Sequence, residues 1–294
     1  MQINPFERIR ARTLVGYAVL TFITTLITVS IFFENKHAPY PEAAEGLLLY
    51  LFLSLFTLRM LSRVDLSYSR LFGTFPTWRT LGRYSLWVIP LVIASIASIY
   101  LLFFPLSFLF PEFVKAWYIE FSPTMIWTSG DNYTLANVLN FLAIVIVAPA
   151  LEEFFFRGIL LTRWTVKWSV VPAVIVSSGV FALLHTNLIG AFCFGCVMAI
   201  LYIRTKSLFV PMCLHVINNL MAWIMELYGT HFGVPTSYRT ITSFQESWWI
   251  GLLTLVISIP CVFQFWRRYI RDIDWRVPYL TESPNSENNA NLYE

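Results

Sequence analysis

The amino-acid sequence predicts an all-α membrane protein with about eight transmembrane helices, and three observations carry this prediction. First, 57% of the 294 residues are hydrophobic and only 13% are charged, whereas soluble globular proteins average about 25% charged residues. Second, apolar stretches of about 20 residues, the length that crosses a bilayer, recur along the chain. Third, basic and acidic loops alternate between these stretches, as the positive-inside rule requires.

The apolar stretches define eight predicted spans. The first follows Arg8, Arg10 and Arg12, which resembles the start of a signal peptide, but it is too long and lacks a small-residue cleavage site. We therefore expect it to remain as a helix. The approximate limits of the spans are 14–33, 45–62, 84–107, 136–160, 172–188, 189–203, 208–227 and 248–266.

The loops predict the topology. Basic residues precede the first span and follow the second, fourth, sixth and eighth spans, whereas the loops after the first and third spans lean acidic. Because Lys and Arg concentrate in cytoplasmic loops, both termini are predicted to be cytoplasmic. The net charge of +3, spread over short clusters, does not indicate a nucleic-acid partner. The basic loop residues are Arg63, Arg70, Arg79, Arg83, Arg163, Lys167, Arg204, Lys206, Arg267, Arg268 and Arg271.

No soluble domain interrupts the spans. The sequence predicts one membrane domain over residues 1–277 and a disordered polar tail, rich in Asn, Ser and Glu, over residues 278–294. The loop from Pro111 to Asn132 is rich in aromatic residues, which favours an interfacial helix. Cys193 and Cys196 lie among small residues that recur every four positions, so we interpret them as packing residues rather than a metal or redox pair.

Charged residues within the fourth predicted span are the strongest functional signal. A charged side chain at mid-membrane costs roughly 2.5 to 3.5 kcal/mol on insertion scales, yet Glu152, Glu153 and Arg157 lie there together. Glu153 and Arg157 have the spacing of an ion pair one helical turn apart. Glu152 is turned about 100° round the helix axis, so a partner on another helix is expected.

Two further spans supply polar residues that can provide this partner. His185 lies four residues after Phe181, and His215 lies four residues before Asn219. A glutamate and a histidine in a semi-dry cavity can activate water as a general base. The other histidine and the asparagine can donate hydrogen bonds to a developing oxyanion. The set therefore fits hydrolysis of a peptide bond inside a membrane.

These residues resemble the motifs of the CAAX-protease and bacteriocin-processing family of glutamic intramembrane endopeptidases, namely EExxxR, FxxxH and HxxxN. The resemblance covers a catalytic core at about residues 136–227. It implies that Glu152 and His185 hold and deprotonate the attacking water and that His215 and Asn219 form the oxyanion site. By the same resemblance Glu153 and Arg157 support the pocket.

The resemblance also implies a mechanism without a metal ion. Two histidines and a glutamate could hold zinc, but the chain has no HExxH motif, and no cofactor is predicted. The four working side chains should converge on one water-sized space that opens to the cytoplasmic side. His185 should lie within about 10 Å of Glu152, the reach of direct or single-water hydrogen bonds.

The leading hypothesis is an intramembrane endopeptidase that cuts a membrane-anchored or lipid-modified protein near its C-terminus. A bacterial plasma membrane is the expected location. The alternative is a non-proteolytic protein that uses the polar cluster as a proton relay, a small-molecule site or a docking or immunity surface, although the two halves lack the repeats that many transporters have. A scaffold fastened by polar contacts is a third possibility, disfavoured because such contacts average about 0.6 kcal/mol.

Overall fold

The computed structural model describes residues 4–33, 39–121, 125–128, 133–234 and 238–281, and within these residues the fold is all-α, as predicted. Seven helices are long and apolar enough to cross a membrane. The prediction of a polytopic membrane protein is thus confirmed. The seven are α2 (Ala11–Phe33), α3 (Tyr40–Leu61), α5 (Trp78–Ser85) with α6 (Val88–Leu109), a long helix from Thr134 to Lys167, α12 (Leu188–Thr205), α13 (Phe209–Phe232), and α15 (Trp248–Phe265) with η4 (Trp266–Ile270).

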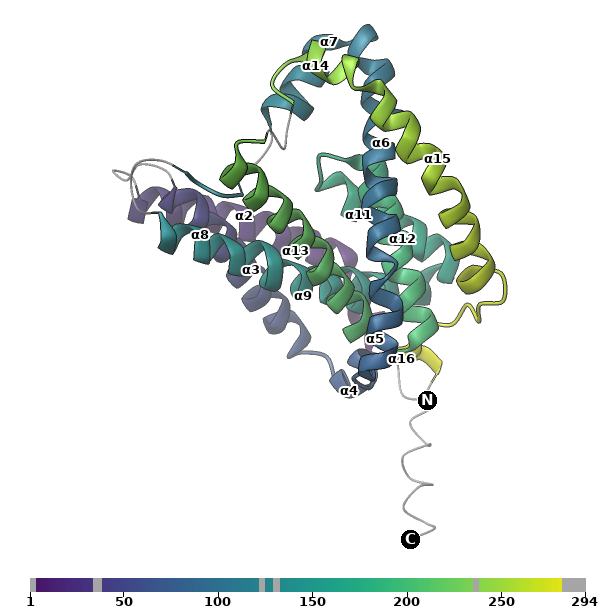
Figure 1. The fold of residues 1–294 in the computed structure, drawn as a ribbon. Coiled ribbons are helices and arrows are strands. Elements are labelled where there is room, and N and C mark those ends of the chain that lie inside the picture. Colours follow the sequence, from purple (N-terminus) through teal and green to yellow (C-terminus); the bar gives the residue numbers. More distant parts are fainter. Residues whose placement is uncertain (1–3, 34–38, 122–124, 129–132, 235–237, 282–294) are drawn as a thin grey trace, which may run out of the picture.

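The fifth predicted span is shorter than expected. Its helix, α11 (Val170–Leu183), has 14 residues and is about 21 Å long at 1.5 Å per residue, less than the roughly 30 Å of a hydrocarbon core. The predicted span ran on to residue 188 because the apolar Leu184 continues the hydropathy of the helix beyond its end. α11 packs against α12 as a hairpin, and Figure 1 shows its turn within the height of the bundle, below α7 and α14.

The fourth span is one continuous helix with two π-helical segments. It consists of α8 (Thr134–Phe141), η2 (Leu142–Val147), α9 (Ala148–Glu153), η3 (Phe154–Leu161) and α10 (Thr162–Lys167). Both glutamates of the candidate site lie at the end of α9, between the two π-helical segments. Such segments inside α-helices occur frequently at functional sites.

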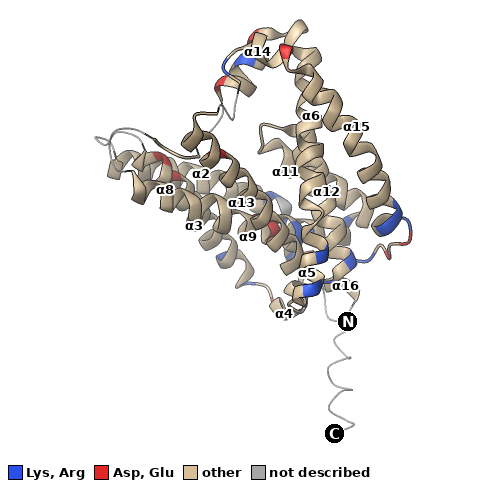
Figure 2. Cartoon of the chain, viewed as in Figure 1, with Lys and Arg blue, Asp and Glu red and all other residues tan. Residues whose placement is uncertain are grey.

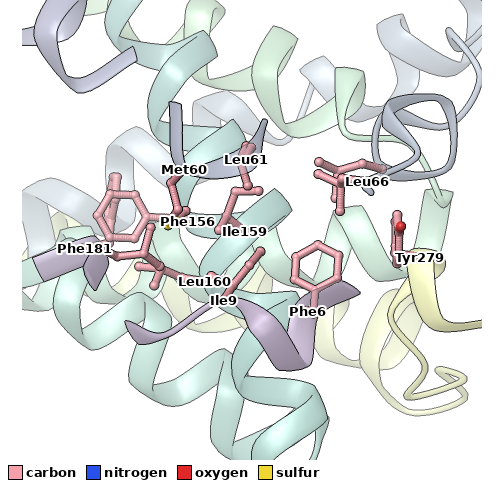
Figure 3. Packing of buried hydrophobic residues seen from close by; sticks show 12 residues of the cluster. Phe6, Ile9, Met60, Leu61, Leu66, Phe156, Ile159, Leu160, Phe181 and Tyr279 are labelled. Atoms are coloured by element: carbon pink, nitrogen blue, oxygen red, sulfur yellow. The ribbon is translucent and has the colours of Figure 1, made fainter. Parts of the chain in front are cut away.

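A hydrophobic core joins the two ends of the chain to the middle of the fold. Figure 3 shows this packing, which includes Phe6 of α1 (Pro5–Arg8), Ile159 of η3 and Phe181 of α11. The ring of Phe6 meets the ring of Tyr279 edge to face at 4.8 Å. Tyr279 belongs to α16 (Pro278–Thr281), so the folded chain extends four residues into the predicted tail, and residues 282–294 lie outside the described residues.

Short helices close both ends of the bundle. The aromatic stretch after Pro111 forms a continuous helix of α7 (Pro111–Val114) and η1 (Lys115–Glu120), as the sequence predicts. Its Tyr118 ring stacks on Phe103 at 4.9 Å and meets Phe244 of α14 (Ile241–Glu246) at 5.4 Å. At the other end lies α4 (Tyr68–Phe72).

Basic residues gather at one end of the bundle. Figure 2 shows Lys and Arg mainly around α5, α16 and the end of α15, opposite to α14. This arrangement agrees with the predicted grouping of basic loops on one membrane side. The assignment of that side to the cytoplasm stays a prediction.

Candidate active site

Glu153 lies at the centre of a buried polar network. Its Oε1 is 2.9 Å from Nη1 of Arg157 and 2.9 Å from Nδ1 of His215. The side chains of Glu153 and Arg157 are 0% and 1% exposed, and the predicted pairing of the two is confirmed. A carboxylate only accepts hydrogen bonds, so Nδ1 of His215 donates to Glu153. The Nε2 atom of His215 is then left for another partner.

Glu152 differs from its neighbour in being accessible. Its side chain is 16% exposed. Oε1 accepts a hydrogen bond of 2.5 Å from the hydroxyl group of Tyr50 on α3, and Oε2 lies 3.9 Å from Nε2 of His215. Glu152 therefore has two neighbours on other helices, Tyr50 of α3 and His215 of α13, where the sequence predicted one partner. Because 3.9 Å is longer than a hydrogen bond, Oε2 remains able to accept one from water.

His185 lies at the turn of the α11–α12 hairpin, two residues beyond the end of α11, rather than within a membrane span as predicted. Its Nδ1 is 2.8 Å from the carbonyl oxygen of Phe181. Because a carbonyl accepts, Nδ1 carries the proton of this bond and Nε2 is left as the acceptor of a neutral ring.

Asn187 fixes this turn. Its Oδ1 caps α12 by accepting from the backbone N–H of Gly190 at 3.1 Å and also accepts from the hydroxyl group of Ser98 at 3.0 Å. Its Nδ2 donates to the carbonyl oxygen of Ser95 at 3.0 Å. A further bond of 3.1 Å joins Nε1 of Trp117 to the carbonyl oxygen of Thr186. These contacts attach the segment that carries His185 to α6 and η1.

Phe181 packs between the polar residues of the site. Its ring centre is 4.3 Å from that of His185 and 6.0 Å from that of His215, and the guanidinium carbon of Arg157 is 4.6 Å from it. The centres of the two imidazole rings are therefore at most about 10 Å apart. Phe181 thus packs against both histidines, one at the α11–α12 turn and one on α13.

Asn219 lies one turn beyond His215 on α13. Its Nδ2 donates to the carbonyl oxygen of Ile144 in η2 at 2.9 Å, and its Oδ1 accepts from Asn218 at 3.2 Å. One of its two amide hydrogens is thus used to hold α13 against the fourth span. The other is available to a ligand.

Gly195 allows α11 and α12 to approach each other closely. A Cβ atom at this position would lie 2.9 Å from Cβ of Ser178 on α11, closer than real Cβ atoms come. The carbonyl oxygen of Gly195 also accepts from Nη2 of Arg157 at 3.2 Å. The predicted packing role of small residues on this helix therefore extends to the support of the Arg157 side chain.

An apolar cavity of about 370 Å³ lies beside the helix that carries Glu152. Its walls come from α3, α4, α9, η3 and α13, and they include Ala150 and Leu151, which directly precede Glu152. Thr57, Phe72 and Met212 lie on other walls. The cavity can take an apolar chain close to the site.

Sequence reasoning missed Tyr50, Asn187, Ser95, Ser98 and Trp117. None of these residues belongs to a charged motif, and a Tyr or Ser in an apolar span carries no signal by itself. Asn187 alone had a usable signal, since an Asn three residues before Gly190 and at the start of an apolar stretch is a helix cap pattern. In the described part of the chain, His, Cys, Asp and Glu residues do not gather in groups of three or more that could hold a metal ion.

Comparison with known proteins shows which family the stretch around this site resembles. Residues 134–221 match the family described as Type II CAAX prenyl endopeptidase Rce1-like, and this stretch contains every predicted site residue. The chain is similar to this family over that stretch. The resemblance to the CAAX-protease and bacteriocin-processing family, indicated by the three motifs, is thereby confirmed.

A membrane peptidase by name is also similar to part of the chain. The Bacillus subtilis protein named "Putative membrane peptidase YdiL" is 35% identical over 85 residues, which are 28% of this chain and 35% of that protein. The chain thus matches about a third of the length of this relative. No solved structure matches the chain.

Proposed function

We propose that the protein is an intramembrane endopeptidase that hydrolyses a peptide bond near the C-terminus of a membrane-anchored or lipid-modified protein. The observation that carries the proposal is the position of Glu152. This accessible carboxylate lies in a membrane span, beside the buried network of Glu153, Arg157 and His215. The similarity of residues 134–221 to an endopeptidase family supports the same class of reaction.

Glu152 acts as the general base of the proposed reaction. It takes a proton from a water molecule whose oxygen attacks the carbonyl carbon of the scissile bond, and it later gives that proton to the leaving amine. The bond from Tyr50 occupies Oε1, so Oε2 is the oxygen that receives the proton. His185 accepts the second hydrogen of the water through Nε2 and holds it in place.

His215 and Asn219 stabilise the negative oxygen of the tetrahedral intermediate. Glu153 accepts from Nδ1 of His215 and thereby orients the imidazole ring, which donates from Nε2 to the oxyanion in the proposed mechanism. Asn219 donates its second amide hydrogen. Each donor of this kind contributes roughly 2.7 to 4 kcal/mol to the transition state in other hydrolases. No step of this mechanism uses a metal ion.

The substrate is proposed to reach the site from the bilayer. The apolar cavity beside Glu152 suits a lipid-modified or membrane-anchored segment, because its walls are almost entirely hydrophobic side chains. The protein is a multi-pass membrane protein, and its Bacillus relative supports a bacterial plasma membrane as the location.

A proton relay is the second candidate function. Tyr50, Glu152, His215 and Glu153 form a row of titratable groups from a partly exposed position to a buried one, and such rows occur in pumps and transporters. A relay would not change the length of any other membrane protein, whereas proteolysis would shorten its substrate.

The experiment that separates the two compares membrane proteomes, C-terminal peptides included, between cells with the wild-type protein and cells with Glu152→Ala. Proteolysis predicts a membrane protein whose C-terminal peptide persists only in the variant. Glu246→Ala, at an exposed position on α14, is the matched control and should leave processing unchanged. Complete processing in the Glu152→Ala cells, with the variant present and folded, would contradict the proposal.

A further inference from the structure

A second pocket lies at the basic end of the bundle, away from Glu152. Its volume is about 340 Å³, and it is lined by Arg10, Arg12, Arg163, Trp164 and Lys167. Arg163 is eleven residues beyond Glu152 on the same span, roughly 16 to 17 Å along the helix at 1.5 Å per residue. The proposed peptidase mechanism uses none of these residues.

The pocket concentrates positive charge without a balancing carboxylate. Four of its five lining residues are cations. In the described part of the chain none of the four forms an ion pair. Arg163 is half-buried, and its Nε donates to the carbonyl oxygen of Ile9, which fixes the guanidinium group in the pocket wall. A site built in this way favours a ligand with negative charge.

The pocket lies where lipid headgroups are found. Arg12 begins the first membrane-spanning helix, and Lys167 ends the fourth. Trp164 lines the pocket and stacks on Trp168 at 5.9 Å, and Nζ of Lys167 lies 4.9 Å from the Trp168 ring centre. Tryptophan is enriched at the level of the headgroups in membrane proteins, so cations and indole rings mark this pocket as interfacial.

We propose that this pocket binds the phosphate group of an anionic phospholipid headgroup. Arg and Lys are the usual ligands of phosphate oxygens, and basic pockets between membrane helices bind anionic headgroups in other proteins. The acyl chains would lie along the exposed apolar surface of α2, which includes Val15, Val19 and Phe22. The bound lipid would link the N-terminal segment to the end of the catalytic span.

Native mass spectrometry of the purified full-length protein tests the proposal, with phosphatidylglycerol and phosphatidylcholine titrated as separate probes. The test variant is Arg10→Gln with Lys167→Gln, which removes one exposed cation from each side of the pocket but keeps Arg12 and Arg163. The matched control is Arg79→Gln with Arg267→Gln. This control also removes two exposed basic residues from span ends, but outside the pocket.

Phosphatidylglycerol should bind wild type and the control alike, and more tightly than phosphatidylcholine. The test variant should bind it about 25-fold more weakly, at about fivefold per cation near an anionic surface. Equal binding of the two lipids by wild type, or equal loss in both double variants, would overturn the proposal. A third arm titrates inorganic phosphate against the bound lipid, from the lipid concentration upward. If phosphate displaced the lipid at concentrations near those of the lipid itself, the ligand would be a soluble anion, and the assignment to lipid would be wrong.

Discussion

The hydroxyl group of Tyr50 donates to Oε1 of Glu152 over 2.5 Å. This bond links α3, which lies outside the stretch that matches the family, to the carboxylate of the proposed general base. It gives one of the first three spans a part in the site. It also makes the two oxygens of Glu152 inequivalent, since one is occupied and the other faces His215.

Tyr50→Phe should lower the rate of peptide cleavage roughly tenfold without unfolding the protein. The substitution removes one donor to the carboxylate, and hydrogen bonds to charged groups contribute about 1.5 to 3 kcal/mol. Cleavage rates of purified wild type and variant provide the measurement. Tyr17→Phe, which alters a ring that stacks on Phe56 at 5.8 Å, is the control. Equal rates for wild type and Tyr50→Phe would show that the bond does not serve the reaction.

Arg157→Met should destabilise the protein by about 3 to 5 kcal/mol, because it leaves the buried carboxylate of Glu153 without its cation. Thermal unfolding in detergent measures the effect. Glu153→Gln combined with Arg157→Met should recover part of the loss, since the uncompensated charge is removed. An unchanged unfolding temperature for Arg157→Met would contradict the role of the ion pair.

Gly195→Ala should destabilise the α11–α12 hairpin by about 1 to 3 kcal/mol through overpacking. The new Cβ would meet Ser178 at 2.9 Å. Gly179→Ala is the matched control, because nothing lies within 4 Å of its Cβ position, and it should be neutral or stabilising by about 0.4 to 1 kcal/mol. Thermal unfolding in detergent compares the stabilities of the two variants. Equal effects of Gly195→Ala and Gly179→Ala would refute close packing at Gly195.

Asn187→Ala should reduce cleavage far more than it reduces stability. The cap is worth about 1 kcal/mol, whereas misplacement of a reacting group by about 1 Å can cost roughly 100-fold in rate. Asn4→Ala, which removes the cap of α1, controls for loss of a helix cap. If both variants cleaved at the wild-type rate, the turn would not need Asn187 to position His185.

Chelation should leave cleavage unchanged if Glu152 activates water without metal. The measurement is the cleavage rate of purified protein after treatment with EDTA, followed by addition of zinc. Loss of activity that zinc restores would replace the metal-free mechanism with a zinc-dependent one.

Hydropathy and loop charge predicted the class of fold because lipid imposes length and polarity on every span. The same reasoning overestimated α11, since Leu183 and Leu184, each 71% exposed, look equally apolar inside or outside a helix. α16 was missed because its four residues are ordered by contacts of Tyr279 with distant parts of the chain, not by local propensity.

Residues that are energetically unfavourable in a membrane revealed most of the candidate site. Charges in a membrane stand out, so Glu152, Glu153 and Arg157 could be found from sequence, and the i, i+4 rule identified the internal pair. The contacts among these residues were less predictable. His215 was expected to contact only the oxyanion, but in the structure it also lies beside Glu152 and Glu153. Tyr50 could not be found, since its importance depends on how α3 packs against the fourth span.

The cleavage rate of purified Glu152→Gln on a substrate identified from the membrane proteome tests the central claim most directly. The substitution keeps the shape of the side chain and its capacity to accept from Tyr50, but it removes the base. The rate should fall by roughly 10²- to 10⁴-fold, while Glu246→Gln cleaves as wild type does. A folded Glu152→Gln variant that cleaves at the wild-type rate would contradict the assignment of Glu152 as the general base.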